Sequence, residues 1–152
     1  MFHLSAQTFS LIYAMNGLGI VIGSGLPSRI NHVSEVRQMK VGMVIVLVDS
    51  LALLVGSWFQ FPLIAVAVLL WFLVLFIGML LTLTTSIIMN QTPQNAGSAS
   101  ALVGLSQNAF GGISSPLVGL FGTASYAPMA GLVLIYSLGA LGLSYQRRMH
   151  AN

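Results

Sequence analysis

The segment from Asn90 to Gly122, NQTPQNAGSASALVGLSQNAFGGISSPLVGLFG, carries the most informative pattern in the chain. After a polar turn it continues with small and apolar residues and contains no charged side chain. On a helix with 100° per residue, its small and polar side chains gather in an arc of roughly 120°: Ser100, Gly104, Gln107, Asn108, Gly111, Ser114 and Ser115. The opposite arc carries the large apolar side chains Leu102, Leu105, Phe110, Ile113 and Leu117. A soluble amphipathic helix would carry charges on its polar face. This pattern therefore predicts a helix in lipid, in which Gly and Ser let neighbouring helices approach closely.

The composition of the whole chain agrees with a membrane protein. Of the 152 residues, 57% are hydrophobic and 5% are charged, and the mean hydropathy is +0.95. Soluble domains carry about 25% charged residues. The net charge of +3 comes from only five basic residues, which is too few for a phosphate-binding face, so nucleic acid is not expected as a partner. Because the chain has no Cys, disulfides and thiolate metal sites are excluded.

The apolar runs predict an all-α membrane protein that forms a single membrane domain over residues 1–152. Each run is long enough to cross a hydrocarbon layer of about 30 Å as a helix. Pro27 is expected to end the first helix, and Gln60-Phe61-Pro62 allows only a tight turn between antiparallel helices. The five predicted transmembrane helices span residues 9–26, 41–59, 63–89, 97–122 and 127–145.

The Lys and Arg residues set the expected orientation. They lie only in the hydrophilic segment 27–40 and in the tail 146–152. Because four predicted spans separate these two segments, both lie on one side of the membrane. The positive-inside rule makes that side cytoplasmic, including the C-terminus. The N-terminus is then outside without a signal sequence, which leads us to expect that a preceding helix is missing.

Two groups of uncharged residues are candidates for contacts at membrane depth. Asn16, Gln107 and Asn108 could line a substrate cavity, or they could form hydrogen bonds between helices. The Gly19-x-x-x-Gly23 pattern is typical of close helix packing. The residues expected to pack against a neighbouring helix are Gly19, Gly23, Gly97, Ser100, Gly104 and Gly111.

Asp49 is the only acidic residue within a predicted span. An isolated carboxylate at that depth costs about 2.5–3.5 kcal/mol on insertion scales. One interpretation is a proton site that faces an aqueous cavity. The other is a protonated or water-exposed carboxyl group that is bonded to a neighbouring Ser and has no role in transport. Both interpretations stay open, because Asp49 has no basic partner within the spans.

Other residue types give little support for an enzyme, a metal site or a cofactor. His3, His32 and His150 lie in the lead, the hydrophilic loop and the tail, so no metal cluster is expected. With two acidic residues in the chain, no catalytic triad can be assembled. The Trp71 side chain could face lipid or a cavity, and the sequence does not decide between them.

Two stretches resemble a known family. LSAQTFSLIYAMNGLGIVIGS (4–24) and AGSASALVGLSQ (96–107) are similar to the eighth and eleventh transmembrane segments of major facilitator superfamily drug:proton antiporters of the bicyclomycin-resistance (Bcr/CflA) type. The first stretch matches a Leu-Ser-x-x-x-Phe lead and an Asn-x-Leu-Gly core at Leu4, Ser5, Phe9, Asn16, Leu18 and Gly19. The second matches an Ala-Gly-x-Ala-Ser-Ala-Leu-x-Gly run at Ala96, Gly97, Ala99, Ser100, Ala101, Leu102 and Gly104, followed by Gln107. The chain departs from the family at Thr82-Leu83, where members often have Pro-Asn, and at Asn90, where they have an acidic residue.

This resemblance implies helices 8–12 of a twelve-helix transporter, which are part of its C-terminal six-helix bundle. It implies a proton-coupled exporter in a bacterial inner membrane, with protons, hydrophobic drug-like molecules and membrane lipid as partners. The family's usual proton-carrying acids lie in the N-terminal half, so we expect a truncated or split chain that needs that half and has little activity alone. Two alternatives remain: a small helical membrane protein that binds or modulates a partner, and an intramembrane enzyme, which the lack of catalytic pairs disfavours.

Overall fold

The computed structural model describes residues 6–30, 32–120 and 127–149. Within these ranges the chain is all-helical, as predicted, and no described residue lies in a strand. One short 3-10 helix, η1 (Pro93–Asn95), precedes α4. The five α-helices are α1 (Ala6–Arg29), α2 (Glu35–Trp58), α3 (Leu63–Gln91), α4 (Ala96–Leu120) and α5 (Ala127–Met149).

Three stretches of the described helices are long and apolar enough to cross a membrane. They are Ser10–Arg29 in α1, Glu35–Trp58 and Leu63–Gln91. The described apolar stretch of α5, Ala127–Leu143, is shorter, and α4 is diluted by Gly, Ser, Gln and Asn. That α4 and α5 cross the membrane therefore stays a prediction. The number and order of the α-helices among the described residues agree with the sequence analysis.

The first loop is shorter than the sequence suggested. Pro27 was expected to end the first helix, but α1 continues through it to Arg29. The backbone hydrogen bond that Pro27 cannot donate is lost only two residues before the helix end, where the loss matters least. α2 begins at Glu35, six residues before the predicted start, and the amides of Arg37 and Gln38 donate to the Ser34 carbonyl at 2.9 and 3.0 Å. A carboxylate in the first turn is favourable at the positive end of a helix.

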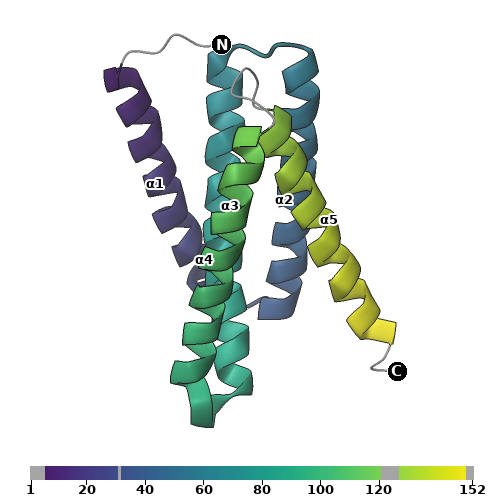
Figure 1. Cartoon of the computed structure of the whole chain (residues 1–152). Coiled ribbons are helices and arrows are strands. Elements are labelled where there is room, and N and C mark those ends of the chain that lie inside the picture. Colours follow the sequence, from purple (N-terminus) through teal and green to yellow (C-terminus); the bar gives the residue numbers. More distant parts are fainter. Residues whose placement is uncertain (1–5, 31, 121–126, 150–152) are drawn as a thin grey trace.

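α3 is the central helix of the bundle. Consecutive α-helices run in opposite directions, and α3 contacts α1, α2 and α4, while α5 lies against α2 (Figure 1). The turn between α2 and α3 is as tight as expected: the Phe61 amide donates to the Gly56 carbonyl at 3.0 Å, and Gln60 takes a positive φ of 50°. The buried core lies between α2, α3 and α5 and consists of Val46, Leu53, Val66, Leu73 and Ala130.

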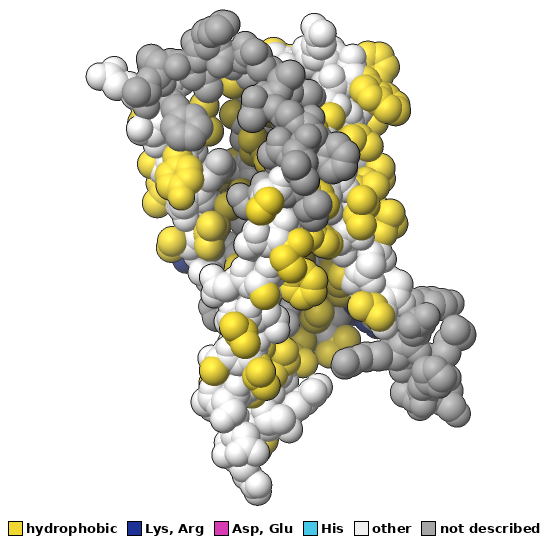
Figure 2. Space-filling model, viewed as in Figure 1, with side chains coloured by type: hydrophobic (Ala, Val, Ile, Leu, Met, Phe, Trp, Pro, Cys, Tyr) yellow, Lys and Arg dark blue, Asp and Glu magenta, His cyan; other side chains and the backbone are white. Residues whose placement is uncertain are grey.

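Large apolar side chains cover much of the outer surface. Figure 2 shows them over the visible face of the described helices, and the visible Lys and Arg atoms lie at the level where α1 ends and α2 begins. Water-facing surfaces do not expose contiguous apolar areas of this extent, whereas lipid-facing surfaces do.

Candidate functional site

The closest helix contact in the structure joins α1 and α3 through glycine. A Cβ atom at Gly23 would overlap the backbone carbonyl of Leu75, and one at Gly78 would lie 2.6 Å from the Ile20 carbonyl oxygen. A Cβ at Gly19 would lie 3.2 Å from the indole Nε1 of Trp71. The structure thus places Gly23 at a contact that only a residue without a side chain permits, and Gly19 at a tight contact with the Trp71 ring.

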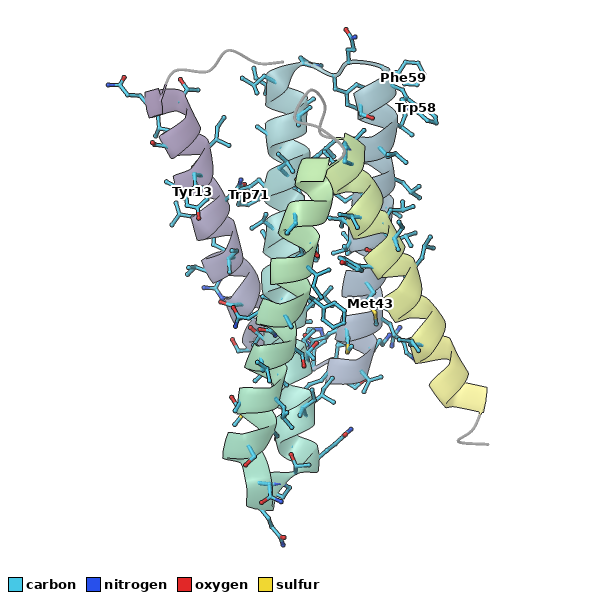
Figure 3. All side chains as sticks on the ribbon, in the orientation of Figure 1. Tyr13, Met43, Trp58, Phe59 and Trp71 are labelled. Carbon is cyan, nitrogen blue, oxygen red and sulfur yellow. The ribbon has the colours of Figure 1, made fainter. Side chains whose placement is uncertain are left out.

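Trp71 lies at this same contact, which answers a question that the sequence left open. Its indole Nε1 donates a hydrogen bond to the Met15 carbonyl of α1 at 3.0 Å, between α1 and α3 in Figure 3. The ring is in edge contact with Phe72. Trp71 is therefore an interhelical anchor, and its partner Met15 could not be found from sequence because any residue of α1 offers a carbonyl.

Asp49 lies in the interior of α2 and is 8% exposed. Its Oδ2 atom has no hydrogen-bond partner among the described residues. The neighbouring Ser50 is fully buried, but its hydroxyl donates to the Leu47 carbonyl at 2.9 Å rather than to Asp49. The interpretation of an Asp bonded to the next Ser is therefore not what the structure shows. An unpaired acidic group inside an apolar bundle is a costly feature, and the other buried side-chain atom without a partner among the described residues is Gln38 Oε1.

A second polar cluster, which the sequence analysis missed, connects the end of α1 to α2 and α3. The Gln38 amide donates to the carbonyls of Ile30 and Val33, both at 2.8 Å, and thereby holds the loop in place. The Ser86 hydroxyl of α3 donates to Glu35 Oε1 at 2.8 Å. Ser86 and Glu35 are 51 residues apart, so no local sequence pattern predicts their contact. The only signal is a Glu in the hydrophilic segment and a polar end on the third apolar run.

Replacing Ser86 by alanine should loosen this junction modestly. A hydrogen bond to a charged group contributes about 1.5–3 kcal/mol. Because the Ser86–Glu35 bond is only partly buried, the expected loss of stability lies near the lower limit. The thermal midpoint of the purified chain in detergent measures the effect, with Ser106→Ala as control, because the Ser106 hydroxyl bonds only to the Leu102 carbonyl of its own helix. Equal midpoints for the two variants would contradict a role for the Glu35–Ser86 bond.

The described residues leave the polar face of α4 largely uncovered. A Cβ atom at Gly97, Gly104 or Gly111 would meet no described heavy atom within 4 Å. Ser100 is half-buried, because the first turns of α4 still lie near α3. The described residues give Gly104 and Gly111 no close neighbour, so their packing against another helix stays a prediction.

Gln107 and Asn108 share this uncovered region of α4. Both are exposed, and the Asn108 amide donates to the Gly104 carbonyl of its own helix at 2.8 Å. One edge of the face does find a partner, because the Ser114 hydroxyl lies 2.8 Å from the Tyr136 hydroxyl of α5. Phe110 and Tyr136 also meet edge to face, with ring centroids 6.3 Å apart.

The structure does not bring the predicted polar residues together into one site. Asn16 is half-buried on α1, Asp49 is buried on α2, and Gln107 is exposed on α4. No hydrogen bond connects these three within the described ranges. The chain thus contains a buried acidic group and an open polar helix face as separate features.

The comparisons with known proteins add a transporter relative. The chain is 32% identical over 149 residues to the uncharacterized MFS-type transporter YdgK of Bacillus subtilis (strain 168). The similarity supports the major facilitator superfamily. It covers 95% of this chain but only 37% of the relative, so the chain spans little more than a third of that transporter's length. No family model and no solved structure matches the chain.

The apolar helices of the chain and this similarity together establish the broad class of the protein. The chain is a multi-pass membrane protein, and its resemblance to an MFS-type transporter favours transport over enzymatic catalysis. The relative's name specifies no substrate and no drug:proton antiporter type. The finer assignment to the bicyclomycin-resistance type is therefore not carried by the comparison.

Proposed function

We propose that the chain forms the C-terminal portion of a proton-coupled exporter of hydrophobic, drug-like molecules and acts together with a complementary helix bundle. The observation that carries the proposal is the open polar face of α4. Gln107 is exposed there, and Gly104 and Gly111 meet no described neighbour. Uncharged polar groups at membrane depth face a cavity or another helix rather than lipid.

The superfamily resemblance suggests that the open polar face of α4 lies against the opposing helix bundle of a transporter. Transporters with two helix bundles work by rocking one bundle against the other around a site near the middle of the membrane. In this arrangement Gln107 and Asn108 border the substrate cavity, and Gly104 and Gly111 let the opposing backbone come close. Apolar side chains beside them, such as Leu105 and Phe110, suit a hydrophobic substrate.

Asp49 is the proposed proton site, distinct from the substrate-facing region. A carboxyl group that takes up a proton loses its charge and becomes compatible with the apolar surroundings of α2. Releasing the proton restores the charge and favours a rearrangement that brings water or a donor to Oδ2. Protonated Asp49 would favour the packing of α2 seen here, and ionised Asp49 would favour a rearranged packing in which water or a donor reaches Oδ2.

We place the protein in a bacterial inner membrane with a cytoplasmic C-terminus. The basic residues lie at the end of α1, in the first turns of α2 and at the end of α5, which supports this orientation by the positive-inside rule. Cysteine labelling from each side tests it: Ser34→Cys should react from the cytoplasm and Gln60→Cys from outside. Labelling of both from the same side would contradict the proposed topology.

The transport proposal is tested by measuring dye efflux from energised vesicles. The chain alone should give no efflux that an uncoupler abolishes, because one bundle cannot close a cavity on both sides. Fused to the part of the Bacillus subtilis relative that it does not cover, it should give uncoupler-sensitive efflux. Gln107→Ala should lower this efflux, whereas Val48→Ala, at an exposed side chain of α2, should leave it unchanged.

Two outcomes would redirect the proposal. Efflux by the chain alone would require a second copy to provide the opposing wall. Absence of efflux from the fusion, together with stable co-purification of the chain with another membrane protein, would favour a small protein that modulates a partner. The same uncovered face of α4 would then be its docking face.

A further inference from the structure

α2 has two opposite faces, and only one of them is used inside the bundle. The first contains Gly42, Val46, Asp49, Leu53 and Gly56, all of which are buried against other helices. At 100° per residue the second face lies on the other side of the helix, within an arc of roughly 100°. Its apolar side chains are between 42% and 58% exposed, so no described helix covers them: Val41, Val44, Val48, Leu51 and Val55.

The ends of this second face have the chemistry of two membrane interfaces. Arg37 and Lys40 lie on it near the start of α2, and Trp58 lies at the far end, 79% exposed and pointing away from the bundle beside Phe59 (Figure 3). From Lys40 to Trp58 the helix rises about 27 Å at 1.5 Å per residue. This length is close to the hydrocarbon thickness of about 30 Å. The basic pair therefore lies at the level of lipid headgroups, and the aromatic pair lies at the opposite interface.

Among the residues that the structure describes, the basic pair has no protein counter-ion. Glu35 is the nearest acidic residue in sequence, but it lies on the buried side of the helix and accepts a hydrogen bond from Ser86 of α3. No ion pair involves Arg37 or Lys40 within the described ranges. The structure thus directs the available carboxylate inward and leaves two cations on a lipid-facing surface, where an anion from outside the chain can neutralise them.

We propose that this outer face of α2 binds an anionic phospholipid. Arg37 and Lys40 hold the headgroup phosphate, and an acyl chain lies along Val44, Val48 and Leu51. Basic residues at the membrane surface attract anionic lipids, and the exposed valine row supplies apolar contact for the chain. The site is independent of transport, because it uses none of the residues that border the proposed substrate cavity.

The test measures lipid binding to the purified full-length chain by native mass spectrometry. Phosphatidylglycerol is titrated into the detergent-solubilised protein, with phosphatidylcholine as the zwitterionic comparison. The Arg37→Gln/Lys40→Gln variant should bind phosphatidylglycerol about 25-fold more weakly, since each basic residue contributes about fivefold at an anionic surface. Its phosphatidylcholine binding should not change. Inorganic phosphate should not displace the lipid, because it lacks the acyl chain.

The Arg147→Gln/Arg148→Gln variant is the matched control, because it removes the same two charges from the chain. It should keep the affinity of the unmodified protein, and circular dichroism should show equal helicity for both variants. Equal loss of binding in the two variants would overturn the proposal in favour of a general charge effect. Unchanged binding in both would overturn it as well, and would mean that a second copy or another helix covers this face.

Discussion

Replacing Gly23 by leucine is expected to separate α1 from α3. The Cβ atom alone would overlap the Leu75 carbonyl, and a backbone atom cannot rotate away as a side chain can. Forcing a bulky residue into a packed contact costs about 1–3 kcal/mol of stability. Because the obstacle is the Leu75 backbone, we expect the loss for Gly23→Leu at the upper end of this range. In a Trp58→Phe background, Trp71 is the single tryptophan, so its fluorescence reports the α1–α3 contact during thermal unfolding.

Gly17→Leu provides the matched control on the same helix. A Cβ at Gly17 would meet no described heavy atom within 4 Å, so this variant should keep the thermal midpoint and the Trp71 emission. Gly78→Leu should behave like Gly23→Leu, because the Gly78 position faces the Ile20 carbonyl. Equal tolerance of leucine at positions 17 and 23 would show that α1 does not pack on α3 through glycine.

Replacing Asp49 by leucine is expected to stabilise the bundle and to abolish the proposed proton coupling. The carboxyl group is buried with an unpaired Oδ2, and a buried polar group without a hydrogen bond costs about 1–3 kcal/mol, a cost that leucine removes. The unfolding midpoint in increasing denaturing detergent should therefore rise. In the fusion with the relative's complementary part, uncoupler-sensitive efflux should fall to background, because leucine cannot bind a proton.

Asp49→Glu and Val48→Leu separate the two effects. Glutamate keeps the ionisable group and should retain part of the efflux, and Val48 is 58% exposed, so leucine there should change neither quantity. A lower midpoint for Asp49→Leu would mean that the carboxyl has a stabilising partner outside the described residues. A stabilised Asp49→Leu protein with full efflux would remove Asp49 from the proton pathway while leaving the transporter assignment intact.

The sequence was sufficient for the helical class and for the order of the helices, because apolar runs separated by short turns allow few other solutions in lipid. The sequence was least informative about where each helix begins and ends. Pro27 was expected to stop α1, but a proline so near the end costs one hydrogen bond only. The sequence reading places the polar residues 35–40 in a loop, whereas the backbone amides of Arg37 and Gln38 bond to the Ser34 carbonyl and α2 begins at Glu35.

Helix pairing was the part that the sequence could not supply. Gly19-x-x-x-Gly23 and the glycines at 104 and 111 have the same local pattern, yet the first pair lies against α3 and the second faces open space. A small residue permits close approach, but the position of a neighbouring helix decides whether the approach occurs. The same limit applies to Asp49: its residue type indicates a special role, whereas its lack of a partner depends on which side chains the fold brings around it.

The α1–α3 contact also imposes an order on biogenesis. Among the described helices, α1 makes its extensive contact with α3 alone, and α2 is synthesised between them. During translation, α1 therefore enters the bilayer before the surface that fits its glycine row exists. Until α3 follows, the glycine row of α1 lacks the surface that it packs against in the folded chain. A pause or a slow codon within α3 would prolong this unpaired interval and expose α1 to quality-control proteases.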